Sequence, residues 1–172
     1  MSNVKWTTKK LALCAILTAL ALGLSALESL FPISLFIPLP GVKLGLANIV
    51  TVFALYELGA VPALVILTAR CFLGSLFAGN FNALLFSLMG GILSMLVMIG
   101  LSRFSRLSLY GVSIGGAAAH NIGQIGAAMI TLGSPMILGY LPMLLGVSLI
   151  TGTLTGFVSS LLFRAMKNVN LS

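Results

Sequence analysis

The chain has 172 residues, of which 59% are hydrophobic and only 6% are charged. Soluble domains carry about 25% charged residues, so water would not solvate a surface of this composition, whereas lipid would. The composition therefore excludes an ordinary soluble enzyme. It predicts an all-α integral membrane protein that forms a single transmembrane domain over residues 1–172.

The net charge is +7, because nine Lys and Arg residues face only two acids, Glu28 and Glu57. Such a charge can attract nucleic acid, but the basic residues do not form one soluble stripe. They lie at the ends of hydrophobic runs, which is the pattern that sets membrane topology. We therefore expect a lipid bilayer as the partner and no nucleic acid.

The first hydrophobic run, residues 10–30, follows Lys5, Lys9 and Lys10. It is as long as a full membrane crossing and leads into further crossings, so we interpret it as a retained helix and not a cleaved signal peptide. A hydrophobic segment with several prolines, residues 31–41, comes next.

Proline, glycine and charge divide the rest of the chain, so that about six transmembrane helices are predicted. Pro142 is expected to kink the last helix or to end a short first piece of it. The second and third helices are short for a hydrocarbon core of about 30 Å. The predicted helices cover residues 10–30, 44–58, 61–77, 81–102, 109–132 and 136–166.

The basic residues predict that both termini lie in the cytoplasm. With the N-terminus inside, only Lys43 falls outside and only Arg70 falls within the membrane. The opposite orientation would reverse this ratio. We therefore expect a multi-pass protein of the bacterial cytoplasmic membrane. The cytoplasmic set is Lys5, Lys9, Lys10, Arg103, Arg106, Arg164 and Lys167.

Two predicted helices carry small residues at four-residue spacing, which lets another helix approach closely. In residues 109–132 we favour packing within the bundle. In residues 10–30 the spacing alone leaves internal packing and docking of a partner protein open. The first stripe is Ala15, Ala19 and Gly23, and the second is Gly111, Gly115, Ala119, Gly123 and Ala127.

Arg70 lies near the middle of the third predicted helix. An arginine at this depth costs at least about 2.5 kcal/mol unless it is paired or hydrated. It is either a structural partner of Glu57 or Glu28, or a binding group for an anionic ligand, because guanidinium matches carboxylate and phosphate geometry. The sequence leaves both interpretations open.

Three polar residues cluster in the fifth predicted helix, namely His120, Asn121 and Gln124. His120 and Gln124 are four residues apart and therefore share a helix face, beside the stripe of small residues. Hydrogen bonds between helices are one explanation. We favour a polar wall of a ligand cavity, because three polar groups within five residues exceed what packing requires.

Further polar residues belong to the outer half of the predicted bundle. Lys43 and Asn48 open the second helix, and Asn80 and Asn82 open the fourth. With Arg70 and His120 they would line a substrate cavity that is open to the outside. For the two asparagines at the fourth helix, ordinary turn and N-cap chemistry is the favoured alternative.

Other chemistry lacks the residues that it needs. No Walker A sequence is present, so ATP hydrolysis by that route is excluded. One histidine and two separate cysteines, Cys14 and Cys71, predict core thiols and no metal site or cofactor. Residues 111–115 match the G-x-S-x-G pattern by accident, because that motif needs a strand-to-helix turn.

Four stretches carry a resemblance to a known family: residues 40–50 (PGVKLGLANIV), 70–74 (RCFLG), 79–81 (GNF) and 118–124 (AAHNIGQ). With these motifs the chain resembles the Gx transporter family, whose members also bear the name heptaprenyl diphosphate synthase component I. The resemblance extends over nearly the whole chain.

That family is in turn similar to the substrate-binding S-components of energy-coupling factor (ECF) transporters. The resemblance implies a six-helix bundle with both termini inside and a ligand pocket that opens outward. It also implies docking of the first helix on a coupling subunit that works with ATPases. Ala15 and Ala19 match the alanine-x-x-x-alanine docking motif of S-components.

The synthase name meets a chemical objection. Trans-prenyl synthases resemble one another in aspartate-rich motifs that hold magnesium, and this chain contains no aspartate. We therefore expect no catalysis by the chain alone. The leading hypothesis is a substrate-binding subunit of a transporter, for an anionic ligand with an apolar or aromatic body such as a vitamin, flavin or isoprenoid precursor. The alternatives are a non-catalytic accessory to prenyl or quinone synthesis, or to flavin-based electron transfer.

Overall fold

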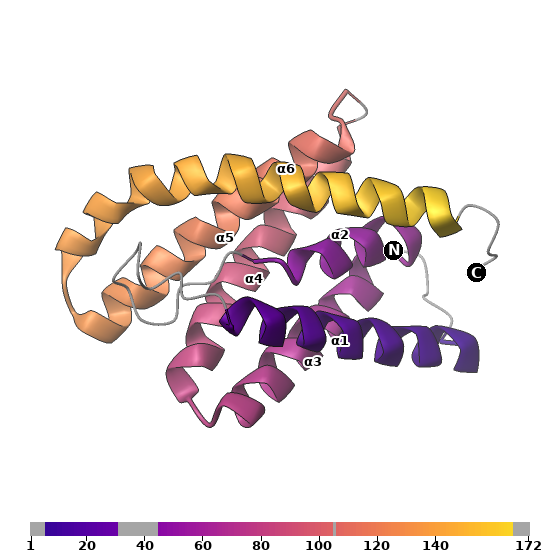
Figure 1. The fold of residues 1–172 in the computed structure, drawn as a ribbon, viewed down its shortest axis with the longest axis horizontal. Coiled ribbons are helices and arrows are strands. Elements are labelled where there is room, and N and C mark those ends of the chain that lie inside the picture. The colour runs from indigo at the N-terminus through magenta and orange to yellow at the C-terminus, as the bar shows by residue number, and fades with distance from the viewer. Residues whose placement is uncertain (1–5, 31–44, 105, 167–172) are drawn as a thin grey trace.

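The computed structural model describes residues 6–30, 45–104 and 106–166, and these residues contain helices and turns but no strand (Figure 1). The all-helical prediction is therefore confirmed. The elements are α1 (Thr8–Ser29), α2 (Asn48–Glu57), α3 (Ala60–Ala78), α4 (Phe81–Ser102), α5 (Leu109–Leu132), the 3-10 helix η2 (Pro135–Tyr140) and α6 (Leu141–Met166).

Local sequence sets most of the helix ends. The side chains of Thr7, Asn80 and Ser108 accept hydrogen bonds from backbone N–H groups in the first turns of α1, α4 and α5. Gly79 and Gly133 follow α3 and α5 with φ of +60° and +62°, the left-handed conformation that ends a helix. These caps explain why the predicted limits of α4 and α5 agree with the structure.

The start of α2 differs from the prediction. The helix was expected over residues 44–58, but it begins at Asn48. Gly45 has φ of +84°, and its carbonyl accepts a hydrogen bond from the Asn48 N–H at 2.8 Å. The carbonyl of Leu46 likewise accepts from the Ile49 N–H at 3.0 Å. A turn therefore occupies residues 45–47 and delays the helix.

The last predicted helix consists of two pieces, as Pro142 led us to expect. η2 forms the short first piece and α6 begins at Leu141. Pro142 is thus the second residue of α6, where its missing N–H removes no hydrogen bond of the helix.

Four helical segments within the described residues are long and apolar enough to cross a membrane: Thr8–Glu28, Ala60–Ala78, Phe81–Ser102 and Pro135–Met166. The chain is therefore a membrane protein. The helix α2 has ten residues and spans about 15 Å, half of a hydrocarbon core. The helix α5 has 24 residues and is not among these four segments; its buried residues include His120, Asn121 and Gln124.

Glycines bring α5 into close contact with both of its neighbours. A Cβ atom at Gly123 would lie 2.5 Å from the Met89 carbonyl oxygen of α4. A Cβ at Gly152 of α6 would lie 2.5 Å from Cα of Ile114 in α5. The α5 stripe therefore packs inside the bundle, as predicted. In Figure 1, α1 begins and α6 ends at the same side of the molecule.

Candidate functional site

Buried polar side chains from several helices meet where α2 begins. Arg70, near the middle of α3, is 7% exposed and donates from Nη2 to Oδ1 of Asn48 at 3.2 Å. Asn48 is the first residue of α2 and is also buried. Among the described residues, the Arg70 Nε atom has no hydrogen-bond partner. One donor of this guanidinium therefore remains for an acceptor from elsewhere.

His120 lies on the other side of the same turn. Its Nε2 is 3.1 Å from Nε2 of Gln124, so the predicted shared face of α5 is confirmed, and both side chains are buried. The imidazole packs against two glycines. A Cβ at Gly90 of α4 would lie 2.9 Å from Cε1, and a Cβ at Gly45 would lie 3.5 Å from Cδ2. The absence of side chains at these positions makes room for the ring.

We name Asn48, Arg70, His120 and Gln124 the polar cluster. Its members belong to α2, α3 and α5, and all four are buried. The cluster contains one cation, two amides and one imidazole. Such groups can donate hydrogen bonds to a carboxylate, phosphate or carbonyl oxygen. Burying such polar groups within a membrane costs free energy. A cluster of them is therefore a candidate functional site.

Asn121 has a different environment from its neighbour in sequence. Its Nδ2 donates to the Leu144 carbonyl oxygen of α6 at 2.8 Å, and the side chain is buried. This bond joins α5 to α6 and is the interhelical role that was weighed as the alternative for these residues. Hydrogen bonds of this kind contribute about 0.6 kcal/mol on average in membranes.

Glu28, which the sequence analysis considered only as a partner of Arg70, also bonds the turn at the start of α2. Its side chain is 2% exposed, and its Oε1 and Oε2 accept from the backbone N–H groups of Gly45 and Leu46 at 2.6 and 3.2 Å. Glu57, the other acid considered as a partner of Arg70, is exposed at the opposite end of α2. The only signal in the sequence was a carboxylate inside an apolar run.

The remaining predicted site residues lie elsewhere. Lys43 falls outside the described residues. Asn80 and Asn82 are exposed at the α3–α4 turn, where Oδ1 of Asn80 accepts from the Asn82 N–H at 2.9 Å. Arg70 is eight residues, or about 12 Å, from Ala78 at the end of α3. These two asparagines therefore make the expected cap and do not join the polar cluster.

The stripe of small residues on α1 faces outward. Ala15, Ala19 and Gly23 are all exposed, and a Cβ at Gly23 would meet no atom within 4 Å. Cys14, on the other side of the helix, is buried, and so is Cys71 in α3. Neither cysteine takes part in a disulfide, as predicted.

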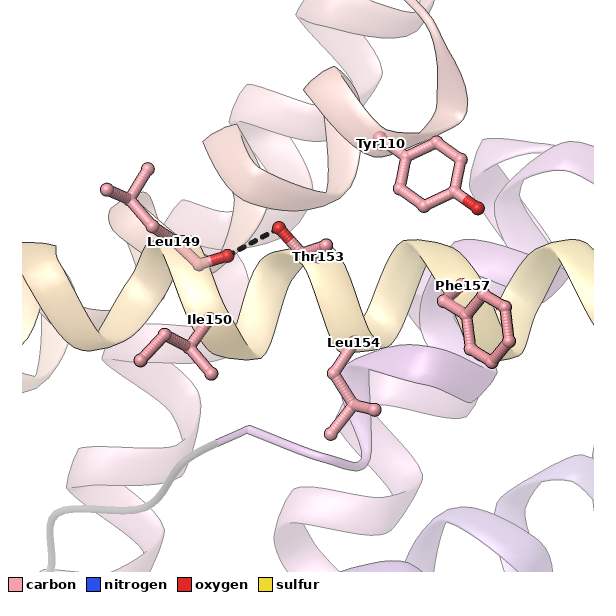
Figure 2. Close-up of a pocket in the computed structure, with 6 residues that line it drawn as sticks. All are labelled: Tyr110, Leu149, Ile150, Thr153, Leu154 and Phe157. Carbon is pink, nitrogen blue, oxygen red and sulfur yellow. Dashed lines mark hydrogen bonds between the residues drawn. The ribbon is translucent and has the colours of Figure 1, made fainter.

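A separate apolar groove runs along α6 beside the start of α5 (Figure 2). Its volume is about 570 Å³, and its one hydroxyl on α6, that of Thr153, is bonded to the Leu149 carbonyl oxygen at 2.6 Å. A surface of this composition suits lipid chains. The lining residues are Tyr110, Leu149, Ile150, Thr153, Leu154 and Phe157.

In comparison with protein families, the chain matches the family described as heptaprenyl diphosphate synthase component I. The matched segment covers residues 17–162, which is most of the chain. It includes the whole polar cluster and Glu28. No curated protein and no solved structure matches the chain.

Proposed function

Because the chain belongs to the heptaprenyl diphosphate synthase component I family, we propose that it is the substrate-binding membrane subunit of a small-molecule transporter. The ligand is an anionic molecule with an apolar or aromatic body, such as a vitamin, a flavin or an isoprenoid or quinone precursor. The protein acts in the bacterial cytoplasmic membrane, with both termini inside the cell.

The buried guanidinium of Arg70 carries this proposal. It has a single side-chain acceptor, Asn48, among the described residues, and its Nε has none. An anionic group that accepts from Nε would satisfy this donor and offset the cost of the buried charge. His120 and Gln124, bonded to each other across one turn of α5, would orient the same group.

Retention of ligand by purified protein tests this proposal. Small molecules carried through gentle purification are identified and counted per protein by mass spectrometry. Arg70→Ala and His120→Ala are expected to reduce retention at least about tenfold, the effect of losing a hydrogen bond to a charged group. Asn82→Ala, at the exposed α3–α4 turn, is the matched control and should retain the wild-type amount. Equal retention in all four proteins would contradict the site.

The exposed stripe of α1 supplies the docking surface in this proposal. Ala15, Ala19 and Gly23 present a smooth face to the surroundings, against which a coupling subunit can pack closely. Transport would then be energised by ATPases bound to that subunit, because this sequence has no Walker A motif of its own.

The family description favours a second candidate, a non-catalytic accessory to heptaprenyl diphosphate or quinone synthesis. We do not propose that the chain catalyses prenyl transfer alone, since two glutamates and no aspartate cannot supply two magnesium-binding motifs.

A pull-down from native membranes separates the candidates. The transporter proposal predicts recovery of a coupling subunit and ATPases. Recovery of a soluble aspartate-rich synthase, with no effect of deletion on uptake, would favour the accessory role. An accessory role in flavin-based electron transfer predicts a flavin-handling defect on deletion.

A further inference from the structure

The turn that precedes α2 is bonded to a side chain from another helix. The N-cap residue of α2, Ala47, has no side-chain group to accept hydrogen bonds from the backbone. The N–H groups of Asn48 and Ile49 at the helix start bond to the carbonyls of Gly45 and Leu46. The N–H groups of the turn itself need other acceptors, because unpaired N–H groups are costly where no water is available. The carboxylate of Glu28, at the end of α1, accepts from Gly45 N–H at 2.6 Å and from Leu46 N–H at 3.2 Å. One side chain therefore satisfies two neighbouring donors.

The same turn carries the contacts of the polar cluster. Asn48 follows it directly and accepts from Arg70 at 3.2 Å. Gly45 lies against Asn48 and His120, because a Cβ there would come within 3.0 Å of Asn48 Nδ2 and 3.5 Å of His120 Cδ2. Any displacement of this turn would therefore move Asn48 relative to Arg70 and change the space beside His120.

We propose that Glu28 is a positioning residue for the ligand site, because its carboxylate holds the turn at residues 45–47 and thereby sets Asn48 against Arg70. This inference rests on the proposed function. The role requires a carboxylate, since each oxygen faces one N–H group. A glutamine at this position would have one carbonyl oxygen and would turn its NH₂ group towards the other donor.

Two measurements on Glu28→Gln test the inference. Hydrogen exchange followed by mass spectrometry reports on the N–H groups of residues 45–48, and ligand retention reports on the site. We expect exchange in that segment to rise about tenfold or more, and retention to fall by a similar factor, as for the loss of a charge-assisted hydrogen bond. Glu57→Gln makes the same chemical change at the exposed end of α2 and should match wild type in both.

A double substitution separates positioning from general destabilisation. If Glu28 acts through Asn48, then Glu28→Gln combined with Asn48→Ala should lower retention no further than the larger single effect. A product of the two single effects would contradict the inference. If Glu28→Gln does not fold, Glu28→Asp keeps the charge with a shorter reach and should lie between wild type and Arg70→Ala in retention.

The other outcomes are equally decisive. Faster exchange at residues 45–48 with wild-type retention would overturn the positioning role and leave the proposed function intact. Unchanged exchange and unchanged retention would also overturn it. Equal retention in wild type, Arg70→Ala and Glu28→Gln would overturn the proposed function, and this inference with it.

Discussion

His120 occupies a space that two glycines leave open. Its ring lies over Gly90 of α4 and beside Gly45 at the start of α2, and it shares a hydrogen bond with Gln124. A core histidine could pack against larger residues elsewhere in a bundle. Here two of the neighbours are glycines, which offer only backbone atoms to the ring. The position of the imidazole therefore depends on both glycines.

Substitution at Gly90 tests that dependence. In Gly90→Ala the new Cβ would lie 2.9 Å from His120 Cε1 and 3.0 Å from the His120 carbonyl oxygen. Because the His120 carbonyl oxygen belongs to the helix backbone and cannot move aside easily, we expect a loss of about 1–3 kcal/mol in stability, the usual result of overpacking. Thermal unfolding in detergent measures it. Gly100→Ala, in the same helix with open space around it, should raise stability by about 0.5–1 kcal/mol. Equal behaviour of the two variants would contradict the packing described.

Substitutions at Gly45 and Gly79 separate the effect of backbone strain from the effect of contact with neighbouring side chains. Both have positive φ, +84° and +60°, so alanine is strained at either position. Only Gly45 has neighbours, Asn48 and His120, within 4 Å of a Cβ. We expect Gly79→Ala to cost about 1 kcal/mol in stability and to leave ligand retention unchanged. Gly45→Ala should lower both stability and retention. Wild-type ligand retention by Gly45→Ala would show that this turn does not contribute to the ligand site.

The helix α1 presents two different faces. Its inner face buries Cys14, Leu17 and Ala21 in the core, whereas Ala15 and Ala19 are exposed on the outer face. Bulky side chains on the outer face would not disturb the bundle, but they would hold another helix at a distance. The proposed docking role therefore predicts that substitutions of these small residues weaken association with a partner and leave the fold unchanged.

Ala15→Leu combined with Ala19→Leu tests the docking role of α1. We expect wild-type unfolding temperature, since both positions are exposed, together with a loss of coupling subunit from affinity pull-downs of at least about tenfold. Ala165→Leu, an exposed alanine in α6, is the matched control. Retention of the partner by the double variant would show that α1 docks elsewhere or not at all.

An element can be predicted from the sequence when the residues that determine its ends lie close to it in the chain. The limits of α4 and α5 follow from Asn80, Ser108 and Gly133, which act within a few residues. The pairing of His120 with Gln124 follows from one helical turn. The delayed start of α2 does not, because the turn before it is bonded to Glu28, 17 residues away from Gly45 in the sequence.

The polar cluster was only partly predictable for the same reason. Arg70, Asn48, His120 and Gln124 stand out as polar groups in apolar runs. The contact between Arg70 and Asn48 spans 22 residues and depends on how α2 packs on α3, which periodicity does not specify. Asn121 shares the motif of His120, yet it turns to the Leu144 carbonyl of α6. Neighbours in a helix point about 100° apart, so sequence proximity does not imply a shared site.

The basic residues of the described chain fit one orientation in the membrane. Lys9 and Lys10 lie at the start of α1, Arg103 and Arg106 lie between α4 and α5, and Arg164 lies at the end of α6. In Figure 1 the start of α1 and the end of α6 lie together. By the positive-inside rule we predict that this end of the molecule faces the cytoplasm.

Labelling of single cysteines tests this orientation. In a background with Cys14→Ala and Cys71→Ala, Asn82→Cys places a thiol at the α3–α4 turn and Arg106→Cys places one between α4 and α5. We expect a membrane-impermeant maleimide to label Asn82→Cys in intact cells and Arg106→Cys only after permeabilisation. The reverse pattern would invert the topology and place the proposed outward opening on the wrong side.

An experimental structure of the wild-type protein, purified with its retained ligand in lipid nanodiscs, examines the binding site itself. We expect density for a small molecule beside Arg70 and His120, with an acceptor atom within about 3 Å of the Arg70 Nε. A structure in which protein atoms alone fill that space and satisfy the guanidinium would contradict it, and the polar cluster would then be a device of helix packing.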